Sequence, residues 1–114
     1  MLTIQSLQEK GANTKEGLER CLNNERIYLR LVKKVLTDES FEKLKNAIAE
    51  NDLDTAFTVA HNLKGSSGNL SLTPLYNSLV EITELLRSRT QTDYTPYLNA
   101  VLENKESLAS LCTD

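Results

Sequence analysis

The apolar residues of this chain recur every three or four positions almost from end to end, which is the spacing of one helix face. No segment of any length alternates apolar and polar residues with a period of two, so the pattern argues against a β-sheet. Short polar turns separate the helical segments, and such turns favour antiparallel packing of sequential helices. We therefore predict an all-α fold, an antiparallel up-and-down four-helix bundle with additional short N-terminal helices. The bundle helices are expected at residues 38–50, 53–70, 74–88 and 93–112.

Several polar residues stand directly before these segments and are suited to cap the free N–H groups of a helix. The expected capping residues are Thr3, Asn13, Asn24, Asp38, Asp52 and Thr73. Gly11 is expected to end the first short helix. Pro74 is expected at the first position of the helix that begins there, a position at which helices tolerate proline. We expect a single domain over residues 1–114, in which the helices of 1–36 flank the bundle of 38–112.

The composition is that of an ordinary globular domain. The chain has 114 residues, of which 39% are hydrophobic, enough for a core without metals or disulfides. The net charge of −3 argues against nucleic-acid binding, which needs a basic patch. No uncharged apolar run is long enough for a membrane span, and the N-terminus lacks a signal pattern. We expect a cytoplasmic protein, and Met1 with no flanking linker favours a free-standing one.

No metal or catalytic constellation can be assembled from the sequence. Cys21 and Cys112 lie far apart, in no zinc-binding spacing, and are expected to be small buried residues or free thiols. The segment KGSSG, residues 64–68, has its lysine before the small residues, whereas a phosphate-binding P-loop has it after them. Neither a catalytic triad nor a specific carboxylate pair is indicated.

The segment AHNLKGSSGN, residues 60–69, holds the only histidine of the chain. Each residue of an α-helix is rotated by about 100° from the one before it. With His61 set at zero, the small and apolar residues of this helix lie between roughly 160° and 260°. They are Ala56, Val59, Ala60, Leu63, Ser67 and Leu70. His61 is therefore predicted to point almost directly away from the core.

The residues predicted to surround His61, within about 60° on the helix surface, are Phe57, Thr58, Lys64, Gly65 and Gly68. An interior glycine costs a helix roughly 1 kcal/mol relative to alanine. Because both glycines are predicted to face solvent, we interpret them as cleared space around the imidazole, not as packing positions. The apolar ring of Phe57 on this solvent-facing side of the helix indicates that an apolar surface of another protein enters this space. The alternative is an incidental histidine beside a solvated lysine and an isolated exposed ring.

Three segments carry a resemblance to a known family. AHNLKGSSGNL, residues 60–70, resembles the signature of histidine phosphotransfer (Hpt) domains, a histidine followed by leucine and Lys-Gly at the second to fourth places. GLERCLNNERIYLRLVKKVL, residues 17–36, is similar to the family's Gly-Leu-x-Arg segment and the helix after it. LYNSLVEITELLR, residues 75–87, resembles the helix that follows the active one. One departure is Ser71, where many members carry glycine.

The resemblance implies a phosphocarrier without kinase or ATPase activity of its own. His61 would accept a phosphoryl group from the aspartate of a receiver domain, through Nε2, and pass it to another response regulator. Lys64 would stabilise the phosphoryl charge. The chain would bind no cofactor, and Mg²⁺ would be held by the receiver. The partners would be response-regulator receiver domains and a hybrid sensor kinase, and we expect a monomer. The residues expected to dock the receiver are Phe57, Thr58, Gly65 and Gly68.

Two other functions stay open. The phosphoacceptor domain of a sensor kinase is also helical, but its histidine is followed by an acidic residue and soon by proline. Here Asn62 follows His61, and no proline comes before Pro74. The other is a helical adaptor whose histidine does no chemistry.

Overall fold

The structure is a computed structural model that describes residues 1–112. These residues form seven α-helices and one short 3₁₀ helix, with no β-strand among them. This confirms the predicted all-α fold. The helices are α1 (Ile4–Glu9), α2 (Thr14–Arg20), α3 (Glu25–Leu36), α4 (Ser40–Ala49), α5 (Leu53–Asn69), α6 (Thr73–Arg87) and α7 (Thr95–Ala109), followed by η1 (Ser110–Cys112).

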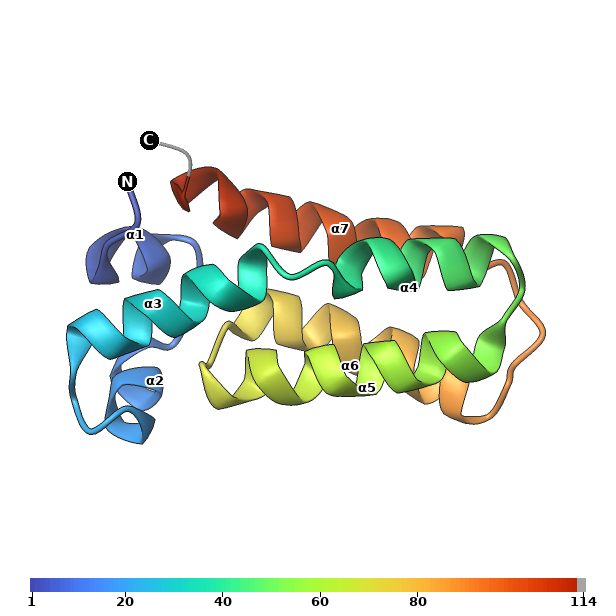
Figure 1. The fold of residues 1–114 in the computed structure, drawn as a ribbon, viewed down its shortest axis with the longest axis horizontal. Helices are drawn as coiled ribbons and strands as arrows, with labels where there is room; N and C mark the ends of the chain where they lie inside the picture. The colour runs from blue at the N-terminus through green and yellow to red at the C-terminus, as the bar shows by residue number, and fades with distance from the viewer. Residues whose placement is uncertain (113–114) are drawn as a thin grey trace.

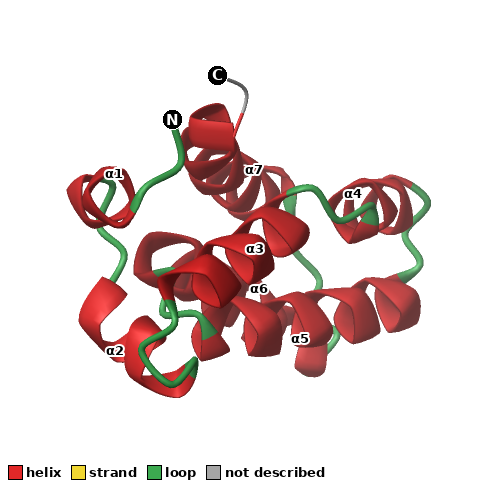
Figure 2. Ribbon diagram, turned by 60° about the vertical axis from the view of Figure 1, so that its left-hand side comes forward, coloured by secondary structure: helices red, strands yellow, loops and turns green. Residues whose placement is uncertain are grey.

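The long helix α6 runs antiparallel to both α5 and α7, and α3 and α4 lie almost end to end along one side of the three (Figure 1). α5 contacts α3, α4 and α6, while α7 contacts α6 and α3. The same arrangement is visible from a second direction in Figure 2. Two successive helices therefore share the fourth position of the bundle.

The role of α3 differs from the flanking role expected for residues 1–36. α4 has 10 residues and is about 15 Å long, whereas α5 has 17 and extends about 25 Å. α4 can therefore cover only part of α5, and α3 covers much of the remainder. Tyr28, Val32 and Leu36 of α3 are at most 1% exposed and belong to the same core as α5–α7. Residues 113–114 of the expected domain lie outside the described residues.

Most helix ends follow the predicted caps. The side chains of Thr3, Asn24 and Asp52 each accept a hydrogen bond from the backbone N–H three residues later, at 3.0 to 3.2 Å. The prediction for Thr73 is wrong, because Leu72 is the cap and Thr73 is already helical. The Thr73 hydroxyl instead donates to the Ser71 carbonyl over 3.3 Å.

The apolar stripe of α7 is interrupted at Asn104 and Lys105, and both side chains have partners on other helices. Asn104 Nδ2 donates to the carbonyl of Pro74 over 3.2 Å, in the first turn of α6. The Lys105 ammonium lies 5.6 Å from the ring centroid of Phe41 in α4. These polar positions therefore connect α7 to its neighbours.

Candidate functional site

His61 lies in the middle of α5, on the face opposite the core. Its side chain is exposed, whereas Ala60 and Leu63 beside it are buried. The remaining buried residues of α5 are Ala56 and Ser67. The predicted helix phase is confirmed, since the imidazole points outward from a helix that is packed along its other side.

Lys64 is the cation nearest to His61 along the helix. It follows His61 by three residues, which places the two side chains on one face. Lys64 is half-buried. Within residues 1–112 its ammonium has neither a hydrogen bond nor an ion pair with another side chain. The charge is therefore available to an anion bound at the imidazole.

The two glycines beyond His61 have different surroundings. A Cβ atom placed on Gly65 would meet nothing within 4 Å, as the cleared-space interpretation requires. A Cβ atom on Gly68 would lie 2.8 Å from Cε1 of Tyr76 in α6. The expectation that both glycines face open solvent is therefore wrong for Gly68. Its missing side chain lets the Tyr76 ring pack against α5, a contact that helix phase alone does not predict.

This difference predicts opposite effects of one substitution on stability. Gly65→Gln should raise the free energy of unfolding by roughly 0.5–1 kcal/mol, since glutamine is the better helix former. Gly68→Gln must displace the Tyr76 ring and should be about 1–2 kcal/mol less stable than Gly65→Gln. Urea unfolding of the two variants measures the difference. Equal stabilities would mean that Tyr76 moves aside without cost.

Phe57 and Thr58 precede His61 by about one turn. The Phe57 ring is half-buried and stacks on the imidazole, with centroids 5.7 Å apart and planes inclined by 23°. Thr58 is exposed, and its hydroxyl donates to the Asp54 carbonyl over 3.2 Å. The structure thus brings together on one face the residues that were predicted to surround His61.

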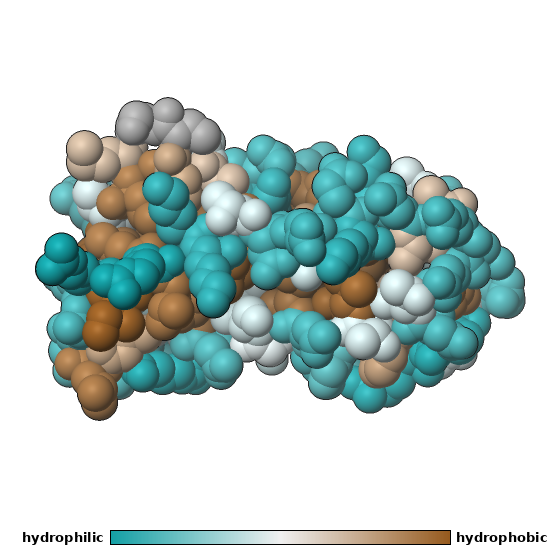
Figure 3. Space-filling view, viewed as in Figure 1, coloured by the Kyte–Doolittle hydropathy of each residue, from teal (hydrophilic) through white to brown (hydrophobic). Residues whose placement is uncertain are grey.

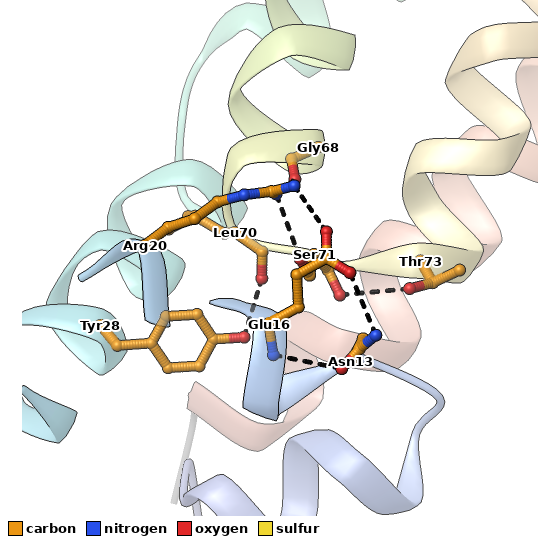
Figure 4. Close-up of polar contacts among 8 residues, drawn as sticks. All are labelled: Asn13, Glu16, Arg20, Tyr28, Gly68, Leu70, Ser71 and Thr73. Carbon is orange, nitrogen blue, oxygen red and sulfur yellow. Dashed lines mark hydrogen bonds and ion pairs between the residues drawn. The ribbon is translucent and has the colours of Figure 1, made fainter. Parts of the chain in front are cut away.

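The C-terminal end of α5 is fastened by α2 (Figure 4). The Arg20 guanidinium donates to the Gly68 carbonyl and, over 3.3 Å, to the Ser71 hydroxyl. Glu16 holds the same guanidinium in an ion pair. The last carbonyls of a helix lack partners within it, so α2 supplies a cap from outside the helix. Sequence patterns did not predict this contact, because Arg20 and Gly68 lie 48 positions apart.

Tyr28 of α3 makes a second contact at this end. Its hydroxyl donates to the Leu70 carbonyl over 2.8 Å, and its side chain is fully buried (Figure 4). Burial raises the pKa of Tyr28 from 10.0 to about 12. The hydroxyl therefore keeps its proton, and the hydrogen bond, well above neutral pH.

Ser71 follows α5 in a left-handed backbone conformation, with φ of +55°. This conformation would account for the glycine that the resemblance to Hpt domains implies at this position, since glycine adopts it without steric cost. Serine keeps the same conformation in this chain. Its carbonyl accepts from the backbone N–H of Asn13 over 2.9 Å, and its hydroxyl accepts from Arg20. The departure from the family pattern leaves the turn intact.

A cleft opens beside the site, between α2, α5 and α6. The lining residues on α5 are Lys64, Gly65, Gly68 and Asn69. Arg20 and Tyr76 are among the residues that line the opposite walls.

An exposed apolar surface lies along α3 and the turn before it, and Figure 3 shows it at the left-hand end of the molecule. Its members are Leu22, 91% exposed, Ile27, 42%, and Leu31, 37%. Leu31 also lines a groove between α3 and the end of α5. The helical spacing of residues in α3 could have predicted that Ile27 and Leu31 are exposed. They lie on the helix surface beside the buried stripe of Tyr28, Val32 and Leu36.

The described residues contain no group of three or more His, Cys, Asp or Glu side chains that could hold a metal ion. Cys21 and Cys112 are free thiols, half-buried in the structure. None of the helices described is both long enough and apolar enough to cross a lipid bilayer.

The comparison with protein families decides the class of this site. A family model described as the Hpt domain matches residues 34–111, which include His61 and all of α4–α7. The chain belongs to the Hpt domain family. Neither a curated protein nor a solved structure matches it. Hpt domains are helical phosphocarrier modules of two-component phosphorelays and interact with receiver domains. In this Hpt domain, α1, α2 and most of α3 lie outside the matched residues.

Proposed function

We propose that this Hpt domain accepts a phosphoryl group on His61 from a receiver-domain aspartate and passes it to another response regulator. The observation that supports this most directly is the outward-facing imidazole of His61 on the family's signature helix. The chain then acts as a carrier without kinase or ATPase activity, in the cytoplasm. The adaptor and the sensor-kinase phosphoacceptor domain remain the alternatives.

The transfer needs only one nucleophile from this chain. The lone pair of a neutral imidazole nitrogen, Nε2 by family analogy, attacks phosphorus of the aspartyl phosphate. A P–N bond forms, the P–O bond to the aspartate breaks, and the carboxylate takes the bonding electrons. Transfer to the second receiver reverses these changes. Mg²⁺ in the receiver's acidic pocket would stabilise the phosphoryl charge from the other side.

Lys64 supplies the charge from this side. Its unpaired ammonium can approach the phosphoryl oxygens, and charged donors make the stronger hydrogen bonds. Lys64→Ala should slow transfer by about tenfold, at a cost of roughly 1.4 kcal/mol in transition-state stabilisation. Rapid-quench transfer assays measure this, and urea unfolding should show an unchanged fold. Lys45→Ala, at an exposed lysine of α4, is the matched control. Loss of stability instead of rate would assign Lys64 a structural role.

The docking surface is proposed to surround His61. The open space at Gly65 and the adjoining cleft would admit the loops of the receiver that carry its aspartate. Thr58, Phe57 and Gly68 lie on the same face and border this approach. The apolar surface of Leu22, Ile27 and Leu31 offers a further contact area beside α5. A carrier must release its partner, so the interface between the Hpt domain and the receiver is expected to be modest in size. The Hpt domain itself is expected to be a monomer.

The test is the chemical nature of the label. The protein is incubated with a phosphorylated receiver domain, and the phosphate found on it should be acid-labile and alkali-stable, as expected for phosphohistidine. Absence of a label with every receiver of the source genome would favour the adaptor. Light scattering tests the remaining alternative, because the sensor-kinase domain is an obligate dimer and a monomer is expected here.

A further inference from the structure

The Phe57 ring is positioned to control the orientation of the reactive imidazole. Phe57 and His61 are four residues apart on α5, so their side chains are neighbours on one face. Their separation of 5.7 Å and inclination of 23° are those of a stacked aromatic pair. An exposed histidine without such a contact rotates freely about its χ2 angle. Stacking restricts that rotation.

Two arginines in turn hold the Phe57 ring. The guanidinium carbons of Arg87 and Arg89 each lie 5.1 Å from its centroid, within the range of cation–π contacts. Arg89 is anchored by an ion pair with Asp54, over 2.8 Å, and by a hydrogen bond of 2.6 Å to the Leu86 carbonyl. The end of α6 and the turn after it thus fix a ring that belongs to α5.

These contacts leave Phe57 occupied by groups of its own chain. We propose that Phe57 is a positioning residue, which stacks on His61 and fixes the imidazole for attack, and that Arg87 and Arg89 hold it there. The inference rests on the proposed function, since a fixed imidazole matters only if His61 reacts. It gives Phe57 a role in the chemical step, in addition to any contact with the receiver.

The stacking can be tested without any partner. His61 is the only histidine, so its ring protons give unique NMR signals. In the wild type, the ring current of Phe57 should shift Hδ2 and Hε1 away from the values of an unstacked imidazole. Phe57→Leu should abolish this shift, and Phe57→Tyr should retain it. Phe41→Leu, which removes the other phenylalanine from the buried core, is the control for lost stability and should leave it unchanged.

The effect on reactivity is measured with phosphoramidate, a small donor that needs no docking. The neutral imidazole attacks phosphorus and a new P–N bond forms, while the P–N bond of the N-protonated phosphoramidate breaks and ammonia leaves with the bonding electrons. Phe57→Leu should lower the labelling rate by about tenfold, as expected for lost orientation, and Phe57→Tyr should restore it. Unchanged signals, or an unchanged rate with phosphoramidate, would overturn the inference.

The receiver assay separates this inference from the proposed function. If phosphoramidate labelling slows in Phe57→Leu but no phosphorylated receiver labels the wild type, the positioning role stands and the relay function fails. If only the affinity for the receiver falls in Phe57→Leu, with unchanged phosphoramidate labelling, Phe57 is a docking residue and the positioning role is wrong.

Discussion

His61→Gln should reduce labelling by a phosphorylated receiver to background. The glutamine amide nitrogen has no free lone pair, because it is delocalised into the carbonyl, so no P–N bond can form. The fold should persist, since the His61 side chain is exposed and surface substitutions change stability by only about 0.5 kcal/mol. Radiolabelled transfer and urea unfolding, carried out on the same preparation, give the two measurements.

The neighbouring exposed residue provides the matched control. Asn62→Ala alters the same turn of α5 without removing the imidazole, and should label at a rate close to that of the wild type. Labelling of His61→Gln at the wild-type rate would place the phosphate elsewhere and refute the proposed function. Loss of label accompanied by unfolding would instead show that His61 supports the structure.

Gly17→Ala should lower the free energy of unfolding by about 3 kcal/mol, the upper part of the range for overpacked positions. A Cβ atom at Gly17 would lie 2.5 Å from Cε1 of Tyr28 and 2.7 Å from the Leu70 carbonyl oxygen. Moving Tyr28 aside would break its buried hydrogen bond to that carbonyl. Moving α2 away would loosen the Arg20 contact with the end of α5. Either adjustment would therefore lower the free energy of unfolding.

Urea unfolding of Gly17→Ala beside Gly65→Ala tests this expectation. Gly65 has open space around it, so the same added methyl group should stabilise α5 by roughly 1 kcal/mol. The two variants differ only in their surroundings. A Gly17→Ala variant as stable as the wild type would show that α2 is not closely packed against the end of α5.

Local patterns in the sequence are sufficient to predict the helices, most of their caps and the direction of His61. Each of these features depends on residues three or four positions apart, and the geometry of a single helix sets how such residues lie relative to one another. The spacing of Ala60, Leu63 and Ser67 was enough to place His61 on the opposite face. The Asn24 and Asp52 caps are equally local, because each side chain bonds a backbone group only three residues away.

The surroundings of that histidine depend instead on how the helices pack together. The Tyr76 ring over Gly68, the Arg87 and Arg89 guanidinium groups over Phe57, and the Arg20 cap on α5 all join different helices. Such contacts depend on how far one helix is shifted and rotated against the next, which no spacing within a helix encodes. The two signature glycines show the difference, since they are alike in sequence. Only the position of α6 leaves Gly65 open and covers Gly68.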